Sequence, residues 1–103
     1  MTDFINLTPH IINLNNGTAY VSRGIARVSN TFSSFNDDGI CEVHYGDIIN
    51  LPKPRKNTVY IVSAMVLAAA KAAGRTDCVA PATGHPDCVR KDGVIVSVPG
   101  FVK

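Results

Sequence analysis

The sequence predicts a small α+β domain: a small mixed β-sheet organised by one central β-α-β unit, with hairpins before and after that unit. Residues 58–62 are β-branched and aromatic throughout, as in a strand that is buried on both faces. An alanine-rich segment and a short apolar run follow, and the order strand, helix, strand favours parallel pairing of the two strands. A chain of 103 residues is typical of one domain, so we expect residues 1–103 to form a single unit.

The N-terminal half has the pattern of β-hairpins. Apolar residues recur with an approximate period of two over residues 4–14, which predicts a strand interrupted near Pro9. Asn15-Asn16-Gly17 favours a turn, because Asn and Gly tolerate positive φ, and residues 19–21 would return as the second strand. A second hairpin is expected from a short strand in residues 24–29, a polar segment over residues 29–39 with a turn at its end, and a partner strand over residues 41–46.

The single main helix is predicted over about residues 63–74. Ser63 is a good N-cap, and residues 64–73 are rich in the helix formers Ala, Leu and Met. Gly74 would supply the C-cap. Residues 77–80 then have the pattern of a short strand.

A C-terminal hairpin is predicted after a loop. Residues 88–90 and 94–98 are apolar enough for two strands, and the turn Lys91-Asp92-Gly93 lies between them. The helix and this hairpin complete the predicted fold.

The predicted helix has almost no polar face, because Lys71 is its only charged residue. A helix that is apolar all round is buried on more than one side. A domain of this size has few layers with which to cover it, so either the N-terminal sheet or another subunit must do so. We therefore expect a homo-oligomer.

Composition argues against several classes of protein. The longest apolar run, residues 64–70, is much shorter than the ~20 residues that cross a bilayer. The N-terminus lacks the pattern of a signal peptide, so we expect a cytoplasmic protein without membrane contact. Three cysteines, an odd number, argue against a disulfide framework. The net charge of +2 is small and the basic residues are scattered, so we do not expect nucleic acid as a partner.

The candidate ligand site lies where the helix begins. Ligands bind beyond the carboxyl ends of parallel strands, and both Ser63 and the loop of residues 81–87 would lie at that edge. A helix N-terminus attracts anions through its free N–H groups, although Ser63 by itself is explained by capping alone. A bulge at Pro9 could aim His10 for a functional role, although an ordinary surface position on an edge strand suits His10 better. Tyr60 could stack on a ring, although a core position suits it better. The loop adds a hydroxyl, a close backbone approach and two titratable groups from Thr83, Gly84, His85 and Asp87.

Catalytic and metal sites have weaker support in the sequence. Neither Cys78 nor Cys88 has the closely spaced partner that structural zinc favours, so we expect no metal and no cofactor. A Cys–His nucleophile remains open for Cys88 with His85 and for Cys41 with His44. No third group that would orient either histidine is evident, so no catalytic residue is assigned.

Several of these segments also carry a resemblance. The chain resembles, over nearly its whole length, a family of short proteins of tailed phages and bacteria. The resemblance implies a phage or prophage setting, and it implies no catalytic residue. It rests on Leu7-Thr8-Pro9-His10, Tyr45-Gly46 with Leu51-Pro52, Tyr60-Ile61-Val62-Ser63, and Gly74-Arg75-Thr76-Asp77 with Pro81 and Thr83-Gly84.

Three functions follow from these observations. The first is a non-enzymatic protein that binds a small anionic, nucleotide-like ligand and, by analogy with small phage proteins, sequesters a host immune signal. The second is a protein-binding inhibitor or a structural phage component, which the apolar helix and exposed sheet edges suggest. The third is a small hydrolase that uses His85 or His10 with Asp87.

Overall fold

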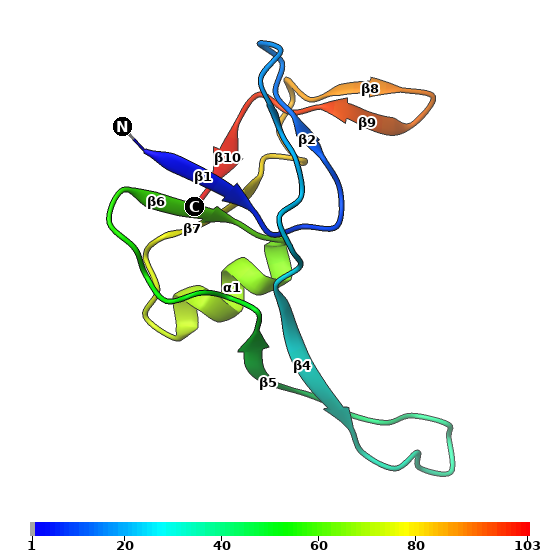
Figure 1. Ribbon diagram of the computed structural model, residues 1–103. Helices are drawn as coiled ribbons and strands as arrows, with labels where there is room; N and C mark the ends of the chain where they lie inside the picture. Colours follow the sequence, from blue (N-terminus) through cyan, green and yellow to red (C-terminus); the bar gives the residue numbers. More distant parts are fainter. Residues whose placement is uncertain (1) are drawn as a thin grey trace.

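A computed structural model describes residues 2–103 and has the predicted α+β fold, mostly β with one short helix (Figure 1). Its centre is a four-stranded mixed sheet in the order β1-β6-β7-β10. Strands β1 and β6 are parallel, β6 and β7 are parallel, and β10 is antiparallel to β7. The four strands are β1 (Asp3–Asn6), β6 (Thr58–Ile61), β7 (Cys78–Pro81) and β10 (Phe101–Val102).

The helix α1 (Ala64–Ala72) connects the parallel strands β6 and β7, so the predicted β-α-β unit is confirmed. Ser63 caps its start: the Ser63 hydroxyl accepts a hydrogen bond from the Val66 amide at 3.3 Å. The helix ends where Gly74 takes a φ of +85°, which favours glycine.

Alternate residues of β6 reach two apolar layers on opposite sides of the sheet. Tyr60 and Val62 pack toward the helix, whose buried residues are Val66, Leu67 and Ala70. Ile61 instead packs with Ile12 and Val98 on the other side. Tyr60, Ile61 and Val62 are all fully buried, as predicted for a central strand.

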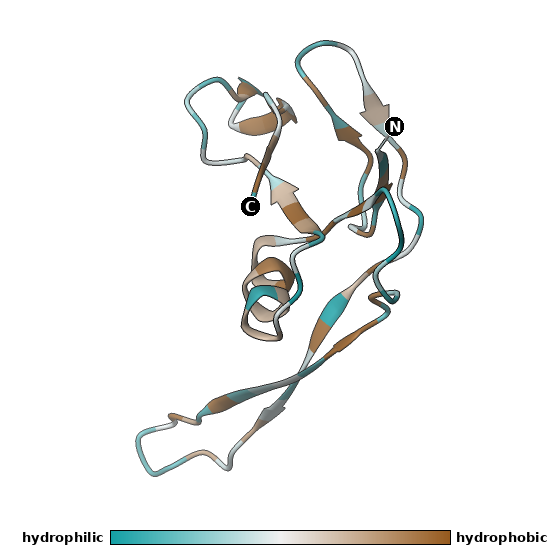
Figure 2. Ribbon diagram, turned by 90° about the vertical axis from the view of Figure 1, so that its left-hand side faces the viewer, coloured by the Kyte–Doolittle hydropathy of each residue, from teal (hydrophilic) through white to brown (hydrophobic). Residues whose placement is uncertain are grey.

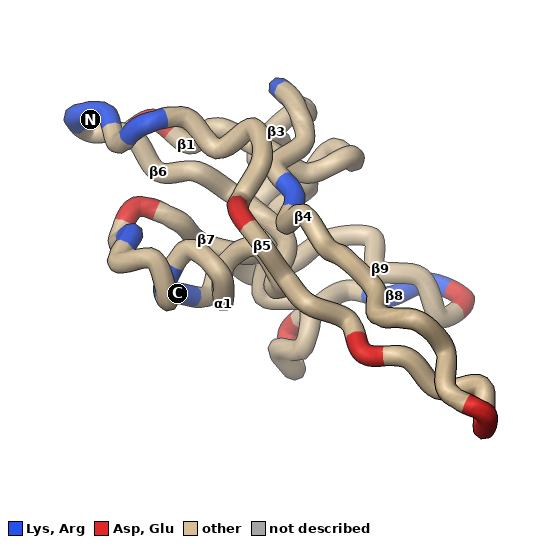
Figure 3. Tube along the Cα trace, turned by 90° about the horizontal axis from the view of Figure 1, so that it is seen from below, with Lys and Arg blue, Asp and Glu red and all other residues tan. Residues whose placement is uncertain are grey.

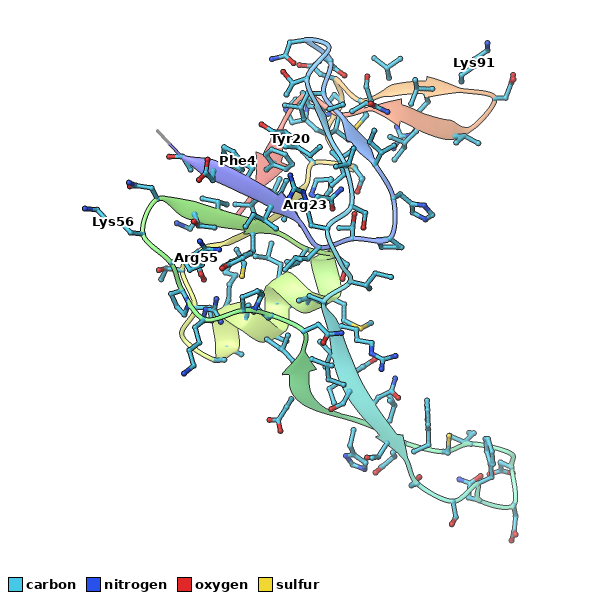
Figure 4. The ribbon with its side chains drawn as sticks, in the orientation of Figure 1. Phe4, Tyr20, Arg23, Arg55, Lys56 and Lys91 are labelled. Carbon is cyan, nitrogen blue, oxygen red and sulfur yellow. The ribbon has the colours of Figure 1, made fainter. Side chains whose placement is uncertain are left out.

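An aromatic cluster closes the side of the sheet away from the helix. Phe4 and Phe101 stack with ring centroids 5.6 Å apart, and Tyr20 lies tilted against both (Figure 4). Tyr20 comes from the predicted first hairpin, β2 (Ile12–Asn13) with β3 (Ala19–Tyr20). The cluster therefore packs this hairpin against both edge strands of the central sheet, β1 and β10.

The second predicted hairpin is present, but its strands are longer than expected. β4 (Arg27–Phe32) begins later than predicted and continues into the segment that the sequence indicated as a polar loop. β5 (Val43–Ile49) pairs with it in antiparallel register, with an irregularity between Val28 and Asn30. We call residues 28–49 the β4–β5 arm, because this hairpin extends away from the rest of the molecule (Figures 1 and 2).

Two parts of the sheet were not expected from the sequence. β1 was predicted only as part of a hairpin, and it pairs instead with β6, about fifty residues further along the chain. β10 was not predicted at all. The C-terminal hairpin was predicted correctly and consists of β8 (Val89–Lys91) and β9 (Val94–Ser97), with positive φ at both Asp92 and Gly93.

The helix is buried on one side and bordered by the base of the arm on a second side. Its remaining face is open, with Met65 56% exposed and Ala68 and Ala72 exposed beside it. One chain alone therefore does not cover this helix on all sides. No helix within residues 2–103 is long and apolar enough to span a membrane.

Candidate functional site

Four segments meet around a cavity of about 590 Å³. They are the β1–β2 loop, the start of α1, the end of β7 and the inner edge of β9. Ser63 and Thr83 both line the cavity, so the expected meeting of the helix start with the loop after β7 is present. The lining residues are Thr8, His10, Ile11, Ile12, Asn13, Ser63, Ala64, Pro81, Thr83, Val94, Ile95, Val96, Ser97 and Val98.

The start of α1 brings partial positive charge to the cavity. The first turn of the helix contains no acidic side chain that would offset this charge. Ser63 satisfies the Val66 amide, and Ala64 lies at the cavity wall. The helix start can therefore receive an anionic group of a ligand.

Asn6 positions the His10 side of the cavity, a role that sequence reasoning missed. Its side chain is fully buried, and its amide donates hydrogen bonds to the carbonyl oxygens of His10 at 2.8 Å and Tyr20 at 2.9 Å. The side-chain oxygen Oδ1 of Asn6 accepts hydrogen bonds from the backbone amide and the hydroxyl of Thr8, at 2.9 and 2.6 Å. One feature of the sequence could have indicated this role: Asn6 is a polar residue inside an apolar strand, and a buried polar residue needs hydrogen-bond partners.

His10 is exposed and lies in the loop between β1 and β2, rather than on a bulged strand as the sequence suggested. Its backbone carbonyl oxygen is held by Asn6, while its ring makes no hydrogen bond within residues 2–103. The imidazole is thus free to contact a ligand in the cavity.

Thr83 faces the same cavity from the loop after β7. The Thr83 backbone carbonyl oxygen accepts a hydrogen bond from the Arg90 guanidinium at 2.9 Å. Because of this bond, a cation lies beside the cavity although no Lys or Arg among residues 2–103 lines it. No Asp or Glu of these residues lines the cavity either.

The opposite wall of the cavity is apolar. It consists of side chains of the β2 region and of β9, among them Ile12, Ile95 and Val98. A ligand that fits this cavity would place an apolar surface against this wall and polar groups toward the helix start.

Gly84 and His85 lie next to this cavity, in a separate groove of about 470 Å³ that Thr83 also borders. The His85 Nδ1 atom accepts a hydrogen bond from the Asp87 amide at 3.0 Å, and the Asp87 carboxylate lies 3.9 Å from it. Both side chains are about half exposed or more. Asp87 lines neither space, so the structure divides the predicted loop site in two.

Tyr60 lies away from the cavity. Its ring is fully buried beneath the helix, and its hydroxyl donates a hydrogen bond to the Lys53 carbonyl oxygen at 3.1 Å. This is the core position that the sequence favoured over a stacking role.

In the part of the chain that the structure describes, no cysteine thiol is hydrogen-bonded to a histidine ring. The Cys88 thiol donates a hydrogen bond to the Ala82 carbonyl oxygen at 2.9 Å, and His44 lies on the arm with Glu42 at 3.7 Å. Burial raises the pKa of the Cys78 thiol, which makes its reactive thiolate scarcer. Within residues 2–103, no three His, Cys, Asp or Glu side chains come together as metal ligands.

A partly buried ion pair lies at the other end of the helix. Arg75 donates to both carboxylate oxygens of Asp77, at 2.9 and 2.8 Å, and to the Pro52 carbonyl oxygen. The hydrogen bonds from Arg75 lower the pKa of Asp77 below its usual value. This pair fixes the chain between α1 and β7 and does not border the 590 Å³ cavity.

Comparison of the chain with protein-family models, with curated proteins and with solved structures gives no match.

Proposed function

We propose that this protein binds, without converting it, a small organic anion with a flat apolar body, of the nucleotide type. The observation that carries the proposal is the two-sided character of the 590 Å³ cavity. Its volume lies in the range of about 300–1,000 Å³ that is typical of small-molecule sites.

The two sides match the two parts of such a ligand. The apolar wall of Ile12, Ile95 and Val98 would take the ring system. The helix start, the Thr83 hydroxyl and the nearby Arg90 guanidinium would take the anionic group. The absence of carboxylates from the cavity lining leaves no charge there to repel an anion.

Binding without turnover suits the groups in the cavity. Within the described chain, the His10 ring makes no hydrogen bond to the Ser and Thr hydroxyls that line the cavity, and no carboxylate lines the cavity to orient it, so the nucleophile–base pair of a hydrolase is not formed there. In the phage setting that the resemblance implies, the protein would act in the host cytoplasm and hold a nucleotide signal away from its receptor.

The proposal is tested by thermal unfolding of the chain against a panel of mononucleotides, dinucleotides and cyclic nucleotides. A ligand at a hundredfold excess over its Kd should stabilise the fold by about 2.7 kcal/mol. Absence of a stability change with every member of the panel would overturn the proposal.

Two variants locate the bound ligand. Val96→Trp should fill the cavity and abolish binding with little effect on stability, because Val96 is 48% exposed. Thr83→Val should weaken binding by about tenfold, through loss of one hydrogen bond. Thr31→Val, the same change on the exposed arm, should leave affinity unaltered and serves as the control. Equal affinity in all three variants would show that the ligand binds elsewhere.

A further inference from the structure

The β4–β5 arm gives this chain an unusually extended shape. The radius of gyration is 15.9 Å, whereas a compact chain of about 100 residues has about 13 Å. The arm nevertheless has ordered hydrogen bonds beyond its strands: the Ser33 amide donates to the Glu42 carbonyl oxygen, and the Asn36 amide donates to that of Ile40. It is thus a formed hairpin that projects from the molecule.

The projecting part of the arm exposes large apolar side chains. Phe32 is 65% exposed, Phe35 72%, Ile40 61% and Tyr45 56%. Several such side chains on one projecting hairpin are unusual for a surface that faces only water. Aromatic side chains in this position are the typical anchors of protein interfaces.

Charge indicates what lies against the arm. Residues 28–49 contain four carboxylates and no Lys or Arg, so the rest of the chain carries a net +6, because the whole chain carries +2. Figure 3 shows acidic groups alone along the far part of the arm, and Arg55, Lys56 and Lys91 extend outward from the rest of the molecule in Figure 4. The arm of one copy is therefore electrostatically complementary to the body of another. The four carboxylates are those of Asp37, Asp38, Glu42 and Asp47.

The open face of α1 is a matching apolar surface on that body. Met65, Ala68 and Ala72 are exposed there, and Lys71 lies on the same part of the helix. The neighbouring 470 Å³ groove offers a further apolar recess for an aromatic side chain, between the helix start and Val102 of β10. Small residues leave this face flat, so a β-hairpin can lie across it.

We propose that two copies of this chain form a two-fold dimer in which each arm lies across the α1 face of its partner. The helix α1 and the arm lie at the same end of the molecule (Figures 1 and 2). Each of two copies can therefore place its arm on the helix face of the other, which closes the assembly and leaves neither arm uncovered. An interface of this kind covers both the exposed aromatic side chains and the helix face that one chain leaves open.

Light scattering coupled to size exclusion tests the assembly with the full chain. The expected mass is twice the 11.0 kDa of one chain. Phe35→Ser should shift the protein toward one chain mass, whereas Val21→Ser, at a similarly exposed apolar site off the arm, should leave the dimer intact. A single-chain mass for the unaltered protein at about 100 micromolar, a dimer that survives Phe32→Ser with Phe35→Ser, or growth beyond two chains would each overturn the proposal.

Disulfide trapping tests where the arm lies. Cys41 is present on the arm, and Ala68→Cys would add a thiol to the exposed helix face. Under mild oxidation, the variant should form a disulfide between Cys41 of one chain and the introduced thiol of the other, identified by mass spectrometry of the linked peptides. The same oxidation of Ala68→Cys with Cys41→Ser should give no cross-linked dimer, which excludes Cys78 and Cys88 as the partners of the introduced thiol. Absence of this disulfide from an oxidised dimer of the variant would overturn the arrangement. The same result is expected if a foreign protein, and not a second copy of the chain, covers the arm.

Discussion

The body of this molecule and its β4–β5 arm are both built from apolar-rich strands, yet they bury those strands to opposite extents. In the body, Tyr60, Ile61 and Val62 are fully buried between the helix and the β2–β3 hairpin. In the arm, Phe32 and Phe35 are 65% and 72% exposed. Residue type alone thus does not decide burial; a strand is buried when two other layers are available to cover it.

The comparison has a functional consequence. The body contributes the cavity and the contacts that hold it, whereas the arm contributes little to either. Substitutions in the body should therefore change stability, and matched substitutions in the arm should change association alone. The same residue change can be made in the two regions and compared at protein concentrations low enough to keep the chains apart.

The largest difference is expected for isoleucine. Ile61→Ala removes a side chain from the fully buried layer opposite the helix and should lower the free energy of unfolding by about 3–4 kcal/mol. Ile40→Ala, at a site that is 61% exposed, should change it by less than about 0.5 kcal/mol. Urea unfolding followed by circular dichroism measures both values. Similar losses in the two variants would mean that the arm packs against the body in solution.

Asparagine gives the second pair. Asn6→Ala breaks the buried hydrogen bonds to Thr8, His10 and Tyr20 and should cost about 2–3 kcal/mol. It should also weaken ligand binding, since the loop that carries His10 loses its support. Asn36→Ala removes two hydrogen bonds that its side chain accepts in the exposed turn of the arm, and should cost less than about 1 kcal/mol.

An Asn6→Ala protein as stable as the unaltered chain would show that Asn6 does not hold the β1–β2 loop. The loop geometry can be followed independently of stability, through the amide hydrogen exchange of residues 8–13. Faster exchange in this segment alone is the expected result.

The local parts of this fold were predictable because their signals are contiguous. The β-α-β unit follows from uninterrupted stretches of strand and helix formers between Thr58 and Pro81. The turns at Gly17, Gly39 and Gly93 follow from glycine, which takes positive φ at all three positions. The meeting of Ser63 with Thr83 then follows from parallel pairing of β6 with β7.

The remaining parts depend on contacts between residues that are far apart in sequence. β1 pairs with β6 across about fifty residues, and no local pattern reports such a pairing. The two residues of β10 are too few to show a period. The exposure of Phe32 and Phe35 could not be predicted either, because aromatic side chains normally indicate burial.

Acid sensitivity distinguishes the two regions by a smaller margin. The side chains of Arg75 and Asp77 are only 19% and 15% exposed. Asp77→Asn breaks their paired hydrogen bonds and should lower the free energy of unfolding by about 1–2 kcal/mol at pH 7. The folded-state pKa of Asp77 is lowered, so its contribution is present above the unfolded pKa of about 3.9 and is lost as pH falls through the lower, folded value. Urea midpoints from pH 7 to pH 2 should converge for the two proteins. Asp38→Asn, in the exposed turn of the arm, provides the control.

A constant gap between Asp77→Asn and the unaltered chain over this pH range would mean that the substitution acts through packing, rather than through the charge of the carboxylate. Arg75→Gln breaks the same pair and also the hydrogen bond to the Pro52 carbonyl oxygen, so it should lower stability at pH 7 by at least as much.

The smallest expected difference concerns two tyrosine hydroxyls. Tyr60→Phe keeps the buried ring and removes one hydrogen bond, to the Lys53 carbonyl oxygen, which should lower the free energy of unfolding by about 1 kcal/mol. Tyr45→Phe, on the arm at 56% exposure, should leave it unchanged. Thermal unfolding resolves a difference of this size, since about 1 kcal/mol corresponds to a Tm shift of about 4–8 °C in a domain of this length. Ligand affinity should stay the same in both variants, because neither hydroxyl borders the cavity. If Tyr60→Phe weakened ligand binding without changing Tm, Tyr60 would contact the ligand after all, and the cavity between the helix start and β9 would not be the whole binding site.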